Sequence, residues 1–222
     1  YGEDVRDETC SDYLNLIIRQ GHESVVVETM VHLLAGELAG LWDEIVLDAI
    51  SEESENFRQL VGQMGRRFHQ NVQLLPKGSC FFIRLPESWE RLIMERPTHF
   101  RQKYKQHLNR LKRKGAVSYD LVRTPDQLEE GFRVLIHLHG KRWSEKGKEG
   151  VFQSGKFLAF HKRFAEQVLP LGYLQLCSLR LEGTPVAANY NFSYNGKVYA
   201  YQSGIDIHID KEVSLGNLME GY

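Results

Sequence analysis

Residues 173–203, YLQLCSLRLEGTPVAANYNFSYNGKVYAYQS, decide the fold of this chain. Apolar and polar residues alternate in three successive runs, which is the pattern of strands with one buried face. Two tight turns separate the runs, and the second, Asn195-Gly196, is a strong signal for a two-residue hairpin. The stretch therefore predicts three consecutive antiparallel strands, at 173–181, 185–194 and 197–203.

The residues before this stretch predict one strand and two helices. Residues 116–122 alternate, and Thr124-Pro125-Asp126-Gln127 has the form of a capping box with proline at the first helical position. Apolar residues then recur at helical spacing, and a second helix begins after Ser154 and ends at Pro170. A doubly wound sheet is excluded, because its strands would alternate with helices. We predict an α/β (α+β) fold, with a mixed, largely antiparallel sheet flanked by helices.

The first half of the chain carries weaker patterns. A basic run, FRQKYKQHLNRLKRKG at 100–115, places apolar residues at spacings of 4, 4 and 3, which predicts a helix with a narrow apolar stripe. A short helix over 87–96 precedes it and stops at Pro97. Further helices are predicted at 11–20, 23–40 and 54–68, and strands at 44–49, 72–75 and 80–85, the last two separated by a turn at 76–78.

Composition and charge limit the class of protein. The chain has 222 residues, of which 42% are hydrophobic, so a wholly disordered protein is excluded. The formal net charge is only −1, but the charges are segregated. Residues 1–60 hold 14 acidic and 3 basic residues, residues 61–115 hold 3 acidic and 13 basic, and residues 116–222 hold 12 of each. This distribution says more about partners than the total does.

The sequence also indicates a compartment. No apolar run approaches the roughly 20 residues of a membrane span, and no basic-then-apolar leader follows Tyr1. Cys10, Cys80 and Cys177 are scattered without Cys-x-x-Cys spacing, which argues against a disulfide framework and a zinc knuckle. We expect a reducing, cytoplasmic setting and no metal site. Because the first residue is not Met, we also expect a piece of a longer chain.

The turn from Lys211 to Leu218, KEVSLGNL, is the feature with the clearest chemistry. It leads into a helix, whose free N–H groups and positive dipole end can bind an anion. Gly216 lets a phosphate approach the backbone, Ser214 can donate a hydrogen bond to it, and Lys211 adds charge. An ordinary serine-capped helix start is the alternative interpretation.

Two other features have both a structural and a functional interpretation. His139 lies on the apolar face of its predicted helix, where a histidine is more often a core residue than a catalyst. The basic helix 100–114 is compatible with binding a nucleic acid or a polyanionic acceptor, and equally with a solvated face that pairs with the acidic N-terminal section. Neither Gly-x-Ser-x-Gly nor His-Glu-x-x-His occurs, so neither a covalent hydrolase nor a metalloprotease is supported.

Taken together, these residues resemble a known family. The runs LHGKRW, KGKEGVF, AFHKRF, LRLEGTPVAANYNFSYNGKVYAYQSGID and KEVSLGNLM resemble the CelD-like (cellulose-biosynthesis-type) acetyltransferase domain of the GNAT superfamily, a relative of the FemAB aminoacyltransferases. The upstream runs SDYLNLI, IRLPESWERL and RQKYKQHLNRLKRKG are similar to it as well. The resemblance covers nearly the whole chain and is most specific over 138–218.

The resemblance implies parts of two tandem GNAT-like halves. On this interpretation residues 1–86 are the closing part of a first half, residues 87–115 are a basic helical connector, and residues 116–222 are a second half truncated at its C-terminus. The donor cleft would then be incomplete, or closed by a partner chain or by the N-terminal strands in a permuted arrangement.

The resemblance also implies an activity, the transfer of an acetyl or other acyl group from acyl-CoA to an amine or hydroxyl. Lys211, Ser214 and Gly216 stand at the fixed positions of the pyrophosphate motif Gln/Arg-x-x-Gly-x-Gly/Ala, and the first two depart from its strict form. We nominate His139 as the general base, acting directly or through water. The donor-binding residues that the resemblance implies are Tyr201, Gln202, Ser203, Gly204, Lys211, Ser214, Leu215, Gly216 and Asn217.

Three hypotheses for function follow. The first is an acyl-CoA-dependent N- or O-acyltransferase that acts on a polysaccharide or a cell-envelope precursor. The second is a FemAB-like transferase that takes an aminoacyl group from tRNA, whose phosphates the basic helix would bind. The third is a non-catalytic binding module that keeps the GNAT fold.

Overall fold

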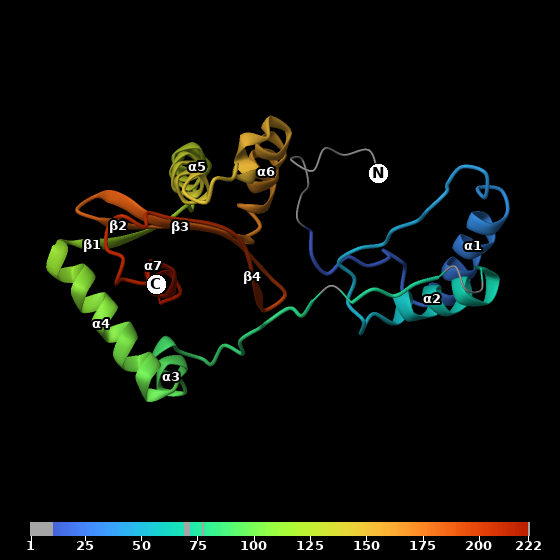
Figure 1. The fold of residues 1–222 in the computed structure, drawn as a ribbon, viewed down its shortest axis with the longest axis horizontal. Coiled ribbons are helices and arrows are strands. Elements are labelled where there is room, and N and C mark those ends of the chain that lie inside the picture. The colour runs from blue at the N-terminus through green and yellow to red at the C-terminus, as the bar shows by residue number, and fades with distance from the viewer. Residues whose placement is uncertain (1–10, 69–71, 77, 222) are drawn as a thin grey trace. The chain divides into compact units, whose positions relative to one another are not determined.

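The computed structural model describes residues 11–68, 72–76 and 78–221, which divide into two compact units at residues 83 and 84 (Figure 1). The first unit is helical. Helices α1 (Glu23–Ala35) and α2 (Glu55–Phe68) pack through Val27, Val31 and Leu60, all of them buried. The predicted helices at 23–40 and 54–68 are thus confirmed, although α1 ends five residues early.

Other predictions for this unit are wrong. Residues 11–20 contain no helix and residues 44–49 no strand; a parallel bridge joins Leu14 to Ile50 instead. Residues 72–75 and 80–85 are not strands either, and Phe81 and Phe82 are 96% and 80% exposed. An apolar run favours extended backbone, but it becomes a strand only where a second strand pairs with it. The predicted turn at 76–78 includes Lys77, which lies outside the described residues.

The second unit contains a four-stranded antiparallel sheet in the order β1-β2-β3-β4. The prediction of a largely antiparallel sheet flanked by helices is confirmed, including the order of the elements after residue 116. In chain order the elements are α3 (Trp89–Met94), α4 (Thr98–Lys114), β1 (Val117–Leu121), η3 (Pro125–Gln127), α5 (Leu128–Ser144), η4 (Val151–Gln153), α6 (Gly155–Val168), β2 (Leu174–Leu181), β3 (Thr184–Tyr194), β4 (Lys197–Ile205) and α7 (Leu215–Met219).

Local signals in the sequence account for much of this unit. The capping box at Thr124 and Gln127 is formed, and the Ser154 side chain caps α6. In the turn between β3 and β4, Asn195 and Gly196 have φ angles of 49° and 70°. A type I′ hairpin turn requires two successive residues with left-handed backbone, so the turn predicted from Asn195-Gly196 is confirmed.

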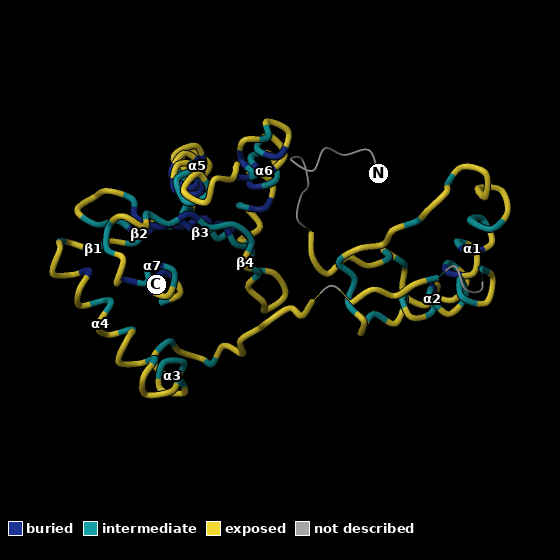
Figure 2. Tube along the Cα trace, viewed as in Figure 1, coloured by how far each residue is buried: buried dark blue, intermediate teal, exposed yellow. Residues whose placement is uncertain are grey.

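Helices cover both faces of the sheet. Helices α5 and α6 lie on one face and α4 and α7 on the other, and the buried residues gather between these layers (Figures 1 and 2). The α5–α6 side has an aromatic core with Phe132, Phe157 and Tyr190. On the other side, Leu111 of α4 packs with Leu215 and Leu218 of α7. The apolar stripe predicted on the basic helix therefore holds α4 against the domain.

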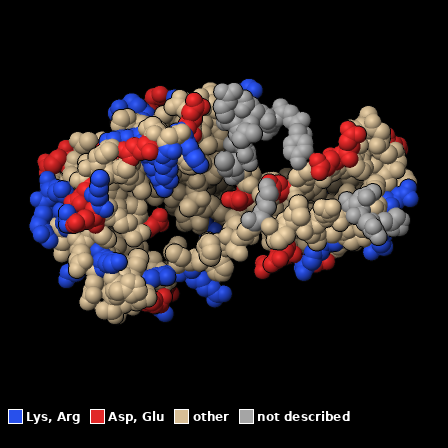
Figure 3. Space-filling model, in the orientation of Figure 1, with Lys and Arg blue, Asp and Glu red and all other residues tan. Residues whose placement is uncertain are grey.

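Part of the charged face of α4 is paired within its own unit. Arg110 forms ion pairs with Asp210 and Glu212, and Lys114 with Asp210. Asp210 and Glu212 belong to the loop between β4 and α7. Figure 3 shows basic and acidic side chains side by side at this end of α4.

Candidate functional site

The edge of the sheet is irregular at Tyr201. Strand β4 is the last strand in the order, so its outer side lacks a neighbouring strand among the described residues. Tyr190 of β3 pairs with Gln202, and Asn191 pairs with Ala200, which leaves Tyr201 as an extra residue. The Tyr201 N–H instead donates to Oδ1 of Asn191 over 3.3 Å. Such a bulge turns a side chain away from the regular alternation and is common beside active sites.

A buried histidine fixes the Tyr201 side chain. Nε2 of His161, on α6, lies 2.9 Å from the Tyr201 hydroxyl, and Nδ1 lies 3.2 Å from the hydroxyl of Tyr190. Tyr190 donates to the main-chain oxygen of His161, so its oxygen accepts from Nδ1–H and Nε2 is left to accept from Tyr201. Burial lowers the pKa of His161 to about 4, which keeps the ring neutral at pH 7.

His139 of α5 contacts the same strand two residues further on, at Ser203. Its side chain extends from α5, is 1% exposed, and has Nδ1 3.0 Å from the main-chain oxygen of Ser203. Burial lowers its pKa, although the bond to Ser203 opposes this. Its Nε2 has no hydrogen-bond partner among the described residues. A neutral imidazole with one nitrogen hydrogen-bonded to a carbonyl and the other unpartnered has the arrangement of an oriented general base.

Further contacts join α5 to the end of β4. Arg142 donates to the Ser203 hydroxyl over 3.1 Å, and Lys141 pairs with Asp206 over 2.7 Å. Gly204 is buried against the helix, because a Cβ there would lie 2.6 Å from the carbonyl carbon of Leu138. These contacts make the side of β4 that faces α5 rigid and fill the space beside Gly204.

The turn into α7 returns to β4. A Cβ on Gly216 would meet Ile205, the last residue of β4, at the ordinary contact distance of 3.6 Å. Leu215 is buried in the core, whereas Lys211 and Asn217 are exposed. The Ser214 side chain makes no capping hydrogen bond, so the serine-capped start does not occur in the form that the sequence allowed.

The structure thus brings most of the predicted residues to one edge. His139 and Arg142 of α5 are hydrogen-bonded to Ser203 of β4, Tyr201 of the same strand is bonded to His161 of α6, and the backbone of Gly216 adjoins the end of that strand. The sequence did not reveal the bulge at Tyr201 or the roles of Asn191 and His161 in holding it. Their positions depend on pairing between residues that are 10 and 40 apart in the chain.

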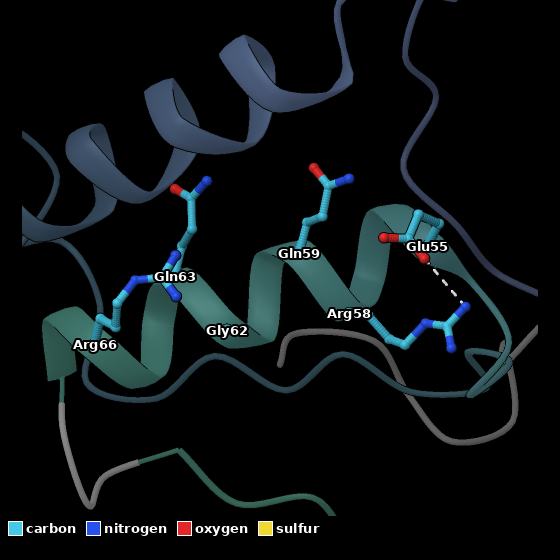
Figure 4. A pocket seen from close by; sticks show the side chains of 6 residues that line it. All are labelled: Glu55, Arg58, Gln59, Gly62, Gln63 and Arg66. Atoms are coloured by element: carbon cyan, nitrogen blue, oxygen red, sulfur yellow. Dashed lines mark ion pairs between the residues drawn. The ribbon is translucent and has the colours of Figure 1, made fainter.

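A separate hollow lies on the first unit, along α2 (Figure 4). Its volume is about 290 Å³, and its lining consists of Glu55, Arg58, Gln59, Gly62, Gln63 and Arg66. Arg58 is engaged by Glu55 over 3.1 Å, and the amides of Gln59 and Gln63 point toward α1. No predicted site residue belongs to it, and it pairs no nucleophile with a base.

Comparison with known families agrees with this fold. The family described as "Acetyltransferase (GNAT) domain" matches residues 98–221, which is more than half of the chain. The chain therefore belongs to the GNAT acetyltransferase family, and this membership supports acyltransferase activity in general. No curated protein matches the chain. In the part that the structure describes, no helix has both the length and the apolar character to cross a bilayer.

Proposed function

We propose that this protein transfers an acetyl or another acyl group from acyl-CoA to an amine or hydroxyl. Family membership supports the class of reaction. One observation supports the site: β4 is bulged, has no neighbouring strand on its outer side among the described residues, and ends beside the turn into α7. The backbone of Tyr201–Gly204 would face the pantetheine arm. Backbone N–H groups from Ser214 to Asn217, with Lys211, would face the pyrophosphate.

The residues present fit such a donor in part. A Cβ on Gly216 would meet Ile205 at an ordinary contact distance and nothing closer, so the backbone there is open to a phosphate. Leu215 fits less well, since its side chain is in the core and its N–H donates to the main-chain oxygen of Val213. Asp210 and Glu212 would repel phosphates, but Arg110 and Lys114 neutralise them.

The proposed chemistry is direct transfer. The acceptor nitrogen or oxygen attacks the thioester carbon, its proton passes to Nε2 of His139, and the carbon–sulfur bond breaks to release the CoA thiolate. The thiolate then takes up a proton, which His139 can return. Nε2 can take up this proton only while the imidazole is neutral, and the lowered pKa of His139 keeps it neutral. The acceptor proposed is a polysaccharide or a cell-envelope precursor, in the cytoplasm.

A CelD-like place within the family remains part of this proposal, as does the arrangement in two tandem halves. A FemAB-like transfer from aminoacyl-tRNA is the second candidate. One observation favours it: Lys103, Lys105, Lys112 and Arg113 of α4 are exposed and make no ion pair with a described residue. A non-catalytic GNAT-fold module would bind neither donor.

Titration calorimetry with acetyl-CoA tests the proposal. We compare the wild type, Gly216→Trp, and Gly155→Trp as a control, because Gly155 also has open space beside it. Heat of binding that is lost in the Gly216 variant and kept in the control supports acyl-CoA as the donor. A wild type that gives no heat contradicts it. Strongly salt-dependent binding of tRNA by the same protein would favour the second candidate.

A further inference from the structure

Nε2 of His139 is the buried side-chain polar atom that lacks a partner in the described structure. The main-chain oxygen of Ser203 can only accept, so the 3.0 Å contact assigns the ring hydrogen to Nδ1. Nε2 then carries the lone pair. A buried acceptor without a hydrogen bond is unfavourable, and a native protein keeps one where it has a use or where a ligand completes it.

The group that covers this lone pair is Gly150. A Cβ on Gly150 would lie 2.9 Å from Nε2 and 2.7 Å from Cδ2 of the same ring. The rings of Trp143 and Phe152 flank the imidazole, with centroids 5.8 Å and 5.0 Å away. Only a residue without a side chain can therefore lie over Nε2 at this position.

Gly150 is buried and accepts a hydrogen bond from the N–H of Gln153 in η4, whereas the segment that leads to it is held by contacts at the surface. Residues 145–149 are exposed, and Gly147 has a φ of 66°. The N–H groups of Lys146 and Lys148 donate to the main-chain oxygen of Trp143, and Nζ of Lys146 lies 5.3 Å from the centre of its indole ring. Glu145 pairs with His208 in the loop after β4. Exposed ion pairs and cation–π contacts are individually weak, so this segment can open without unfolding the domain.

We propose that residues 145–150 form a movable cover over His139, and that the acceptor reaches Nε2 by displacing it. This inference rests on the proposed acyl transfer. The acceptor places its N–H or O–H hydrogen beside Nε2 on the side that Gly150 now covers, and the proton passes to the lone pair as the new bond to the acyl carbon forms. Closed, the segment keeps water from Nε2; open, it admits an amine or a hydroxyl.

Diethyl pyrocarbonate, a small electrophile that acylates neutral imidazole, serves as the probe. Peptide mass spectrometry gives the rate for His139, with exposed His99 as the internal reference. In the wild type we expect His139 to react at least about tenfold more slowly than His99. In Gly150→Ala the new Cβ displaces the segment, and the two rates should agree within about threefold. Gly140→Ala is the matched control, since Gly140 adjoins His139 in α5 and has nothing within 4 Å.

A second variant avoids any change in the core. Glu145→Ala removes the surface contact with His208 and should raise the rate at His139 about two- to fivefold. The inference is overturned if Gly150→Ala, shown to be folded by circular dichroism, leaves His139 as protected as in the wild type. It is also overturned if Glu145→Ala leaves the rate of His139 modification unchanged, because the segment would then not move.

The same proteins separate this inference from the donor proposal. Gly150 lies on neither β4 nor the turn into α7, so Gly150→Ala should bind acetyl-CoA as the wild type does. If the wild type fails to bind acetyl-CoA while His139 responds to both variants, the cover stands and the proposed donor falls. If acetyl-CoA binds and the rate at His139 changes in neither variant, the proposed donor stands and the cover falls.

Discussion

The hydroxyl of Tyr201 lies 2.9 Å from Nε2 of His161, which ties the bulged residue of β4 to helix α6. The other nitrogen of the ring contacts Tyr190 on β3, so one buried imidazole joins two strands and a helix. Because the extra residue of a bulge lacks regular pairing, this contact explains why Tyr201 keeps one orientation. The bulge and the histidine should therefore act as a unit.

The first prediction concerns the free energy of unfolding of variants in this unit. Tyr201→Phe leaves Nε2 of buried His161 without its partner and should cost about 1–3 kcal/mol. His161→Phe removes the ring nitrogens that contact the two tyrosine hydroxyls, although Tyr190 can still donate to the main-chain oxygen of residue 161, and should cost a similar amount. The double variant removes the Tyr201–His161 pair as a whole, so its loss should fall short of the sum by about 1 kcal/mol. Urea unfolding measures all three.

Tyr194→Phe is the control for this cycle. Tyr194 is 57% exposed, so removal of its hydroxyl should change the free energy of unfolding by less than about 0.5 kcal/mol. Strict additivity of the two single losses would mean that Tyr201 and His161 do not act as a unit.

The second prediction concerns pH. Burial lowers the pKa of His161 from about 6.5 in the unfolded chain to about 4, and it lowers that of His139 as well. The unfolded state therefore binds more protons between pH 6.5 and 4, and stability falls as the pH is lowered through this range. His161 alone should account for a loss of about 2 kcal/mol between pH 7 and pH 5.

Urea unfolding of the wild type and His161→Gln at both pH values tests this. The variant starts from a lower stability but should lose about 2 kcal/mol less than the wild type over the interval. His99→Gln removes an exposed histidine and should follow the wild type. Equal losses in the wild type and His161→Gln would show that His161 titrates normally in the folded protein.

The third prediction separates two glycines of the site. Gly204→Ala forces a Cβ against the backbone of α5, 2.6 Å from the carbonyl carbon of Leu138, and should destabilise the protein by about 1–3 kcal/mol. Gly216→Ala has ordinary contact space at 3.6 Å, so its stability should stay within about 1 kcal/mol of the wild type. Its acetyl-CoA affinity should fall if a phosphate lies on that backbone. Thermal or urea unfolding and calorimetry distinguish the two roles, and equal destabilisation would contradict the packing argument.

The second unit could be predicted because its signals are local. The alternation of β2 to β4, the Asn195-Gly196 turn and the capping box at Thr124 each act within a few residues, and each is formed. The first unit failed where apolar runs were taken as strands. Phe81 and Phe82 favour extended backbone, but pairing depends on a partner strand that no local pattern can supply.

The candidate site residues were chosen by residue type, and the contacts that hold them were not predicted. Gly216 and His139 were marked by residue type, since glycine admits an anion and histidine can hold a proton. The bulge at Tyr201 is a mismatch of register with β3, and it shows only when both strands are in place. The contact of Gly204 with α5 joins residues far apart in the chain, so spacing along the sequence does not reveal it.

The last prediction concerns Arg110, which holds the loop before α7 from outside the site. Its guanidinium donates to Asp210 over 2.6 Å and to Glu212, and this bonding is the main cause that lowers the pKa of Asp210 to about 2. Arg110→Ala should loosen the loop, because Glu212 then loses its basic partner and Asp210 keeps only Lys114, beside the proposed pyrophosphate site. We expect acetyl-CoA affinity to fall about five- to tenfold, as calorimetry at low salt would measure. Arg113→Ala removes the same charge from α4 without breaking an ion pair to a described residue, so it should bind nearly as the wild type does. If the two variants lose affinity equally, the general charge of α4 attracts the donor and the position of the loop does not depend on Arg110.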